Sequence, residues 1–433
     1  MLKLLKSPNI TKSVNKYLVT LLILFIPLYP KFPLFTVPGS SVAVRLEDFV
    51  VLFALLIWVF FNASKIKSLL RIKITHAVLL FFLVGLLSVL SGVFLTNTID
   101  LQLGVFHLVR RMQYILPLFI GMTAVSSKED LHYYIKLLGT VIVFALVYGI
   151  GQKYLHLPII TTQNSEYAKG VALFYLPGAH LVSTFAGHYD LANFLVLISP
   201  LFVMLAAKQK KILYILFLVG IFLASLWLLV NAASRISVVT FMGSIILGLL
   251  LIRKYLWIPL IIIISFLFIL TSSNLMDRYV RIFRVAAEQA LTTVITPVYA
   301  QDGEVYEDRS TSIRLNVEWP RALRAFEKNP LLGTGYSSIT LATDNDYLRM
   351  LGEIGAIGTL SFFLIFARIF EQIRKSKNIF VLAITAAIPG IMLNMVFIDI
   401  LEASKFALMF WLLIGIAISA VIFENGKKNF KNN

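Results

Sequence analysis

Long apolar runs recur along almost the whole chain, and they limit its possible folds more than any other feature. Twelve of them approach the ~20 residues that a helix needs to cross the hydrocarbon core of a bilayer, although the first two are short. They cover residues 17–29, 49–62, 76–96, 103–124, 131–152, 189–207, 211–230, 235–252, 255–272, 346–370, 378–398 and 403–423. Only 14% of the residues are charged, well below the share in soluble domains. The sequence therefore predicts an all-α polytopic membrane protein with about 12 transmembrane helices.

The net charge of +17 follows membrane topology rather than affinity for nucleic acid. With the amino terminus inside, every inner connection carries lysine or arginine, whereas the outer connections 97–102 and 399–402 carry neither. Four lysines precede the first apolar run, which has no clear cleavage site after it. We expect a retained signal-anchor helix, both termini in the cytoplasm, the lipid bilayer as a partner, and no nucleic acid.

One long polar segment interrupts the apolar pattern and divides the chain into three parts. Residues 1–272 would hold helices 1–9, residues 273–345 a large external loop, and residues 346–433 helices 10–12. Apolar residues three and four apart predict amphipathic helices at 276–290 and 313–327 within the loop, the second open to a bend at Pro320. The loop is rich in arginine, at positions 278, 281, 284, 309, 314, 321 and 324.

These arginines indicate a phosphate-binding loop, because a guanidinium group binds phosphate through two parallel hydrogen bonds. Arg314, Arg321 and Arg324 share one face of the second predicted helix, and Arg278, Arg281 and Arg284 form a stripe on the first. Arg235 follows small polar residues at the start of a span, where a helix N-terminus also favours anions. The alternative is that these arginines lie against lipid headgroups.

The acidic segment Asp344-Asn345-Asp346 lies just before the next span. One of its two aspartates could cap that helix, and the other could take a proton from an acceptor hydroxyl; we assign that role to Asp344. Glu353, within the apolar run, needs a partner, and Arg349 four residues earlier is suitably placed to form a structural ion pair.

Other polar residues at span boundaries are weaker candidates. His188 is more often a structural residue than a catalyst at such a position, and Arg45 could form an interfacial ion pair with Glu47 or Asp48. Arg110 and Arg111 must face protein or water, and could either bind phosphate or pair with acids. The chain has no cysteine and six scattered histidines, so we expect no metal site and no other cofactor.

Several segments together resemble the O-antigen ligase and polymerase family of bacterial membrane enzymes. In order, they are RLEDFVVLFALLIW (45–58), GHYDLANFLVLISP (187–200), SRISVV (234–239), EWPRALRAFEKNPLLGTGYSSI (318–339) and DNDYLRMLGEIGAIG (344–358). The last two are similar to the family patterns W-x-x-A-L…P-L-x-G-x-G and H-N-x-Y-L…E-x-G-x-x-G. Each match is weak alone, but their order is specific.

The resemblance implies an inverting, metal-independent glycosyltransferase of the bacterial inner membrane. Its donor would be a glycan on undecaprenyl pyrophosphate, and its acceptor a glycan or a lipid. The expected catalytic residues are Asp344, Arg314 and Arg235, and the expected substrate-binding residues are Arg321, Arg324, Arg45, Asn345, Asp346, Tyr347 and His188.

This chain departs from the family pattern at Asp344, where family ligases have histidine. A carboxylate is a weaker base than an imidazole near neutral pH unless its surroundings raise its proton affinity. The departure favours a polymerase over a ligase. A flippase for the same lipid-linked glycans is the alternative, although transporters are commonly built from two related halves and need no large external loop. A third reading is a headgroup-binding scaffold without turnover.

Overall fold

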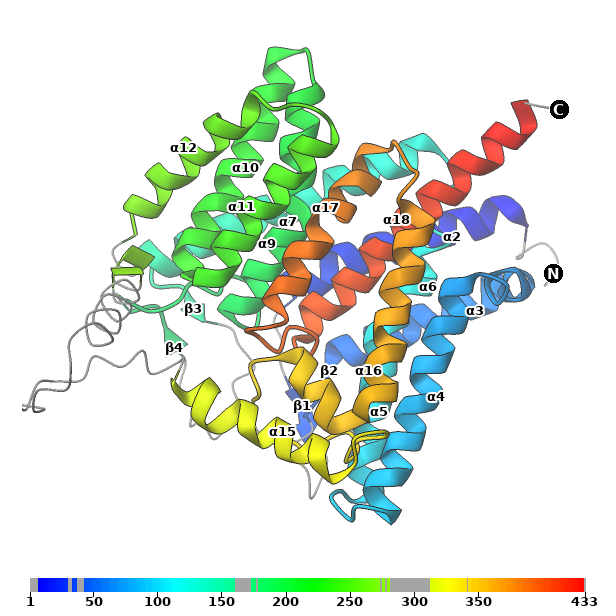
Figure 1. Cartoon of the computed structure of the whole chain (residues 1–433). Helices are drawn as coiled ribbons and strands as arrows, with labels where there is room; N and C mark the ends of the chain where they lie inside the picture. Colours follow the sequence, from blue (N-terminus) through cyan, green and yellow to red (C-terminus); the bar gives the residue numbers. More distant parts are fainter. Residues whose placement is uncertain are drawn as a thin grey trace, which may run out of the picture.

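The described part of the chain is a bundle of helices with very little sheet (Figure 1). The structure is a computed structural model, and it describes residues 7–29, 33–36, 43–159, 173–176, 178–272, 275–276, 279–280, 312–340 and 342–431. The predicted helix 276–290 and the stripe Arg278, Arg281 and Arg284 lie almost wholly outside these residues, as does Arg309.

The helices and strands follow the apolar runs closely. The first half contains α2 (Pro8–Leu28), α3 (Leu46–Leu69), α4 (Lys73–Phe94), α5 (Leu101–Ile115), α6 (Pro117–Gly121) and α7 (Lys128–Tyr154). The second half contains α9 (His188–Lys208), α10 (Ile212–Ala232), α11 (Arg235–Leu251), α12 (Trp257–Leu270), η1 (Arg314–Glu318), α15 (Trp319–Lys328), α16 (Asp346–Ile373), α17 (Ile379–Asn394) and α18 (Ser404–Lys431). Two antiparallel strand pairs join β1 (Pro33–Thr36) to β2 (Ala43–Arg45) and β3 (Pro158–Ile159) to β4 (Leu173–Phe174).

The prediction of an all-α, multi-pass membrane protein is confirmed. Eight described helices are long and apolar enough to cross a bilayer, namely α2, α3, α4, α7, α9, α10, α16 and α18. Helices α11, α12 and α17 are apolar but shorter. The first two predicted spans extend beyond their apolar runs, so α2 and α3 reach 21 and 24 residues.

The predicted span 103–124 is wrong as a single helix. Helix α5 ends at Ile115, and the short α6 begins at Pro117. Proline has no amide hydrogen and its ring crowds the preceding turn, so it interrupts a helix at this point. The break leaves Arg110 and Arg111 in the last turns of α5.

Helices α9 and α18 form the centre of the bundle. In their most apolar stretches, 94% of α9 and 89% of α18 is buried by protein, against 22% of α3. Figure 1 shows α9 among α10, α11 and α17, and α18 running beside α2. Packing against the neighbouring helices therefore fixes where these two central helices begin, at His188 and Ser404.

A second correction concerns α16, which was predicted as a span over 346–370. The helix is kinked at Gly355, whose φ is 65°. The kink frees backbone groups, and the preceding loop satisfies them: Thr334 and Gly335 donate to the carbonyls of Gly352 and Glu353 at 2.9 and 2.8 Å. In return, Ala356 donates to the carbonyl of Pro330 at 2.8 Å. Glu353 therefore lies in the short segment before the kink.

The part of α16 before the kink packs against the loop helix. A Cβ at Gly352 would lie 2.9 Å from the carbonyl oxygen of Ala322, so α15 packs directly on the first part of α16. The predicted helix 313–327 is confirmed as η1 followed by α15. A wide turn precedes Pro320, because proline cannot donate the hydrogen bond of a regular helix there.

Candidate functional site

An ion pair between Arg314 and Asp344 is the centre of the candidate site. Nη2 and Nε of Arg314 donate to Oδ2 of Asp344 at 2.7 and 3.1 Å. The Arg314 side chain is 12% exposed and that of Asp344 is 29% exposed, so the carboxylate keeps access to solvent. Two residues that were predicted separately as catalytic are thus in direct contact.

Burial and neighbouring polar groups shift the pKa values of Arg314 and of nearby Glu318. Burial works to lower the pKa of Arg314, but the carboxylate of Asp344 outweighs it, and the hydroxyl of Tyr189 acts in the same direction, so the pKa is raised. Burial raises the pKa of Glu318, with Asp344 adding to the rise, while Arg314 and Arg321 oppose it. Arg314 therefore stays fully charged, and Glu318 gives up its proton less readily than a solvent-exposed glutamate.

Arg321 acts on the same carboxylate, Glu318, as Arg314 does, whereas Arg324 is exposed. One terminal nitrogen of Arg321, Nη1, is buried and has no hydrogen-bond partner among the described residues. Arg324 is exposed on α15. The loop arginines therefore do not share one environment as predicted. Arg321 is better placed than Arg324 to bind an anion next to Arg314.

The residues after Asp344 hold the loop in place. Asn345, rather than either aspartate, caps α16 by accepting from the amide of Leu348 at 3.0 Å, so the capping role predicted for Asp344 or Asp346 is wrong. Asp346 is buried and accepts from the amides of Ile400 and Leu401. Substrate binding by Asn345 and Asp346 remains a prediction, although both already have structural partners.

Tyr347 and His188 have structural contacts as well. The Tyr347 hydroxyl donates to the carbonyl of Met392 at 2.8 Å, which ties α16 to α17. The ring of His188 stacks on that of His180, with centroids 4.2 Å apart, and contacts Tyr189. Because Tyr189 reaches Arg314, this aromatic group lies beside the ion pair.

Asp399 is a residue of the site that sequence reasoning missed. Its carboxylate accepts from the amides of Thr343 and Asn345 at 2.8 and 2.9 Å and binds Nη1 of Arg349 at 2.9 Å. It thereby fixes the residues before and after Asp344. Asp344 itself adopts a left-handed backbone conformation with φ 48°. The available signal was an acid in the short connection that faces the arginine-rich loop.

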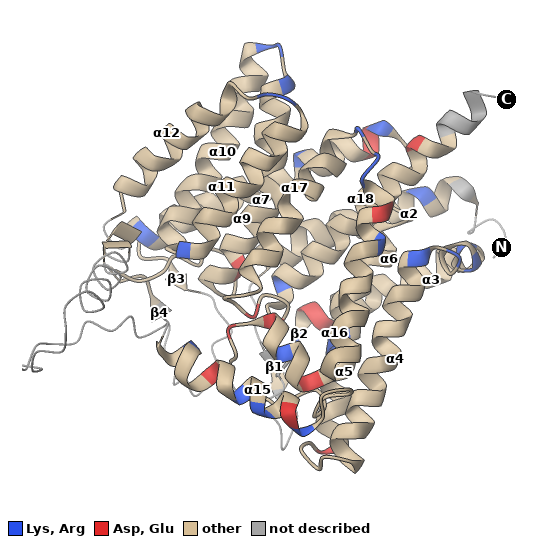
Figure 2. Cartoon of the chain, viewed as in Figure 1, with Lys and Arg blue, Asp and Glu red and all other residues tan. Residues whose placement is uncertain are grey.

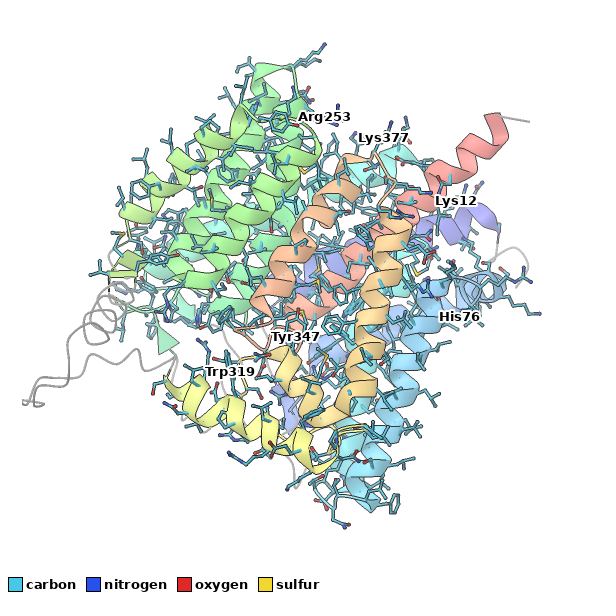
Figure 3. All side chains as sticks on the ribbon, in the orientation of Figure 1. Lys12, His76, Arg253, Trp319, Tyr347 and Lys377 are labelled. Carbon is cyan, nitrogen blue, oxygen red and sulfur yellow. The ribbon has the colours of Figure 1, made fainter. Side chains whose placement is uncertain are left out.

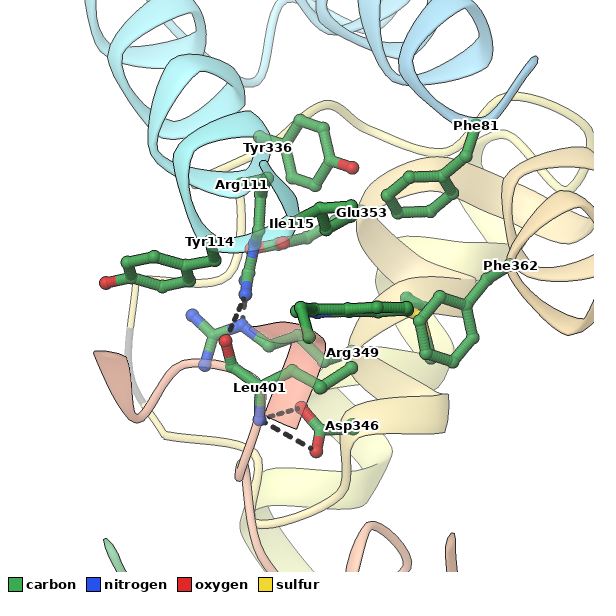
Figure 4. Close-up of a pocket in the computed structure, with 12 residues that line it drawn as sticks. Phe81, Arg111, Tyr114, Ile115, Tyr336, Asp346, Arg349, Glu353, Phe362 and Leu401 are labelled. Carbon is green, nitrogen blue, oxygen red and sulfur yellow. Dashed lines mark hydrogen bonds and ion pairs between the residues drawn. The ribbon is translucent and has the colours of Figure 1, made fainter. Parts of the chain in front are cut away.

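A network of ion pairs lies beneath this loop. Figure 4 shows Arg111, Arg349, Glu353 and Asp346 of this region around one cavity. Arg349 contacts Glu353 at 3.5 Å, which confirms the predicted pair, and Glu402 at 3.2 Å. Arg111 also pairs with Glu402 and donates to the carbonyl of Leu401. Tyr336 and the arginines line a cavity of about 40 Å³, enough for a few water molecules.

Arg45 and Arg110 belong to a neighbouring cluster. Arg45 lies 3.6 Å from Glu47, as predicted, and Arg110 lies 3.9 Å from Asp48. The carboxylate of Glu47 also accepts from the hydroxyl of Ser404 at 2.6 Å. The structure thus favours pairing with acids for Arg110 and Arg111, and Glu47, the partner of Arg45, joins α3 to the start of α18.

Lys405 was also missed by sequence reasoning. It is fully buried at the start of α18, and its amine donates to the carbonyls of Tyr29 and Thr184 at 2.7 and 2.6 Å. The only signal in the sequence was a single lysine within an apolar run, which needs partners in a membrane protein. Lys405 links α2 to the loop that leads into His188.

Arg235 begins α11, as predicted, next to the N-cap residue Ser234. Its carbonyl oxygen accepts from the hydroxyl of Tyr279 at 3.1 Å. Behind it, α11 is joined to α17 by Thr240, which donates to Asn394 at 3.1 Å. The catalytic role of Arg235 stays a prediction.

Residues 220–363 match the family model described as O-antigen ligase. This part of the chain is similar to an O-antigen ligase family domain. The match includes Arg235, Arg314, Asp344 and the kink at Gly355, and it confirms the resemblance. Among curated proteins, none matches the chain. Together with the apolar helices, this similarity supports membrane glycan processing and polysaccharide biosynthesis.

Proposed function

We propose that the chain is a bacterial inner-membrane glycosyltransferase that polymerises glycans carried on undecaprenyl pyrophosphate. The contact between Arg314 and Asp344 carries this proposal: an arginine suited to phosphate and a carboxylate suited to a hydroxyl proton meet from positions 30 residues apart. Both lie within the O-antigen ligase family match. A flippase would not need this pairing of an anion-binding group with a base.

The proposed reaction is a single displacement. The acceptor hydroxyl oxygen attacks the anomeric carbon of the donor, its proton passes to Asp344, and the bond from that carbon to the pyrophosphate oxygen breaks. The electron pair leaves with the pyrophosphate, and the configuration at the anomeric carbon inverts. Arg314, with Arg235 and Arg321, binds the leaving group as its charge grows, without a metal ion.

The present ion pair gives the donor a role in activating the base. Oδ2 of Asp344 accepts two hydrogen bonds from Arg314, so the guanidinium group occupies an oxygen that would otherwise face the acceptor hydroxyl. A pyrophosphate group that binds Arg314 would compete with the carboxylate and release it toward the acceptor. Under this proposal, the base becomes effective only when the donor is bound.

The proposed topology supports this chemistry. The shorter helices α11, α12 and α17, together with α5–α6, would bring the number of spans to the predicted 12. Both termini would lie in the cytoplasm and the loop at 273–345 outside, where lipid-linked glycans are assembled into polymers. Polymerisation is favoured over ligation because Asp344 occupies the position of the ligase histidine.

Two variants test the proposal in the native host: Asp344→Asn and Arg314→Ala, with Lys328→Ala as an exposed control from α15. Surface polymer and lipid-linked repeat units are measured at equal membrane levels of protein. We expect both variants to lose polymer and accumulate outward-facing units, while the control does neither. Accumulation of inward-facing units would indicate the flippase instead, and unchanged polymer in Asp344→Asn would remove this residue as the base.

A further inference from the structure

A second and much larger cavity lies at the opposite end of the bundle from the candidate site. Its volume is about 1060 Å³, and its walls come from α7, α9, the connection from α16 to α17, and α18. Figure 3 labels Lys377, from this cavity, at one end of the molecule, and Trp319, which follows Arg314 on the loop helix, at the other. Nothing in the proposed glycosyl transfer uses this cavity.

Uncompensated positive charge lines the cavity. Lys128, Arg374, Lys375 and Lys377 line it, are exposed, and form no ion pair with any described residue.

The two acids of the lining are already bound. Glu371 pairs with Lys73 and Arg368, each at 2.8 Å, and Glu424 accepts from the side-chain amide of Asn378 at 2.9 Å. The four cations therefore remain available for an anion.

The backbone adds to this positive potential. Helix α17 begins at Ile379, on the cavity wall, and its first turn contains no acidic residue. The positive end of its dipole is thus not offset by its own side chains. Asn378 caps this helix by accepting from the amide of Phe380, and its side-chain amide is the donor to Glu424 described above.

One wall of the cavity is apolar. Leu131 and Ile135 from α7, Leu205 from α9, and Phe380 from α17 line it. Ile135 and Leu205 are partly exposed, and a soluble anion would leave them against water. A phospholipid with an anionic headgroup satisfies both parts, because its phosphate meets the cations and its acyl chains meet the apolar wall.

We propose that this cavity is a binding site for an anionic phospholipid. The phosphate binds Arg374, Lys375, Lys377 and Lys128, and the acyl chains lie along α7 and α17. Because the segment from 374 to 377 connects α16 to α17, the bound lipid lies at the junction of these two helices.

The test uses the full-length protein, purified in detergent, with phosphatidylglycerol or phosphatidylcholine added. Retained lipid is counted by native mass spectrometry. The test variant is R374Q/K375Q/K377Q, and the matched control is K210Q/K211Q/K254Q, which removes three exposed cations from other connections. Soluble glycerol phosphate, added at the same concentration as the lipid, separates a lipid site from a site for free phosphate.

We expect the wild type and the control to retain phosphatidylglycerol in preference to phosphatidylcholine, and the test variant to lose this retention at least about tenfold. Three results would overturn the proposal: equal retention of both lipids, unchanged retention in the test variant, or displacement of the lipid by glycerol phosphate. Because the altered side chains are exposed, the variants are expected to fold, and their melting temperatures verify this.

Discussion

Positive charge is held in two different ways at the two ends of the bundle (Figure 2). At the candidate site, Arg314, Arg349 and Arg111 are largely buried, and each is paired with a carboxylate. At the opposite end, Arg374 and Lys377 are exposed and have no ion-pair partner among the described residues.

This difference separates two kinds of anion recognition. Buried arginines held by acids are fixed in place before a substrate arrives, which is what transition-state stabilisation requires. Exposed lysines and arginines around an apolar wall can adapt to a lipid headgroup, and they need no defined geometry. We therefore expect substitutions at the first end to change the rate of transfer, and substitutions at the second end to change lipid binding only.

The largest effect is expected from a change at Gly355, because the backbone kink of α16 lies there, at the end of the bundle that holds the candidate site. Gly355→Ala places a Cβ about 2.3 Å from the carbonyl oxygen of Leu331 and forces alanine to a φ of 65°. We expect destabilisation by roughly 3 kcal/mol or more, or loss of folded protein, measured by thermal unfolding in detergent. Gly243→Ala is the matched control, because its Cβ would meet no atom of the described residues within 4 Å. Equal stability of the two variants would show that the kink is not essential.

Asp399→Asn is expected to have the next largest effect. It removes the carboxylate that holds Thr343, Asn345 and Arg349, so Asp344 loses its fixed position. We expect the transfer rate to fall about 10- to 100-fold with little change in donor binding, since Arg314 is retained. Lys377→Gln, at the unpaired end, should leave the rate within twofold. Similar losses in the two variants would contradict the separation of the two ends.

Lys405→Met tests whether the buried lysine is structural. The change leaves the carbonyls of Tyr29 and Thr184 without their donor, so we expect a loss of about 1–3 kcal/mol in stability. The measurement is the shift in melting temperature. If stability is unchanged but transfer is abolished, Lys405 acts in the reaction and the site extends to α18.

Glu318→Gln is expected to have the smallest effect. The folded pKa of Glu318 is raised, so its ionisation opposes folding: stability is lost as pH rises from the unfolded pKa through the folded one. The variant should therefore match the wild type at low pH and be slightly more stable at neutral pH, by less than about 1 kcal/mol. Melting curves at several pH values measure the difference, and a variant that is less stable at neutral pH would reverse the predicted sign.

Sequence patterns predicted the helices well, because hydrophobicity and length decide which segments cross a membrane. The loop helix at 313–327 and the pair of Arg349 with Glu353 also followed from three- and four-residue spacing. The break after Ile115 had a visible signal in Pro117, which the apolar composition of the segment obscured.

The kink at Gly355 could not be predicted from hydropathy. It depends on hydrogen bonds between the backbone of α16 and a loop more than fifteen residues earlier, such as Gly335 to Glu353. Asp399 and Lys405 were missed for a related reason. Each acts on backbone groups of segments distant in sequence, and local spacing carries no information about such contacts.

The central claim is that Arg314 and Asp344 act as one unit in glycosyl transfer. A double-mutant cycle with Arg314→Ala, Asp344→Asn and the double variant tests it, with single-turnover transfer measured on purified protein and lipid-linked donor. Groups that act together are strongly non-additive, so we predict that each single variant loses about 10²- to 10³-fold and that the double variant loses little more. Losses that multiply in the double variant would show independent roles and contradict this account.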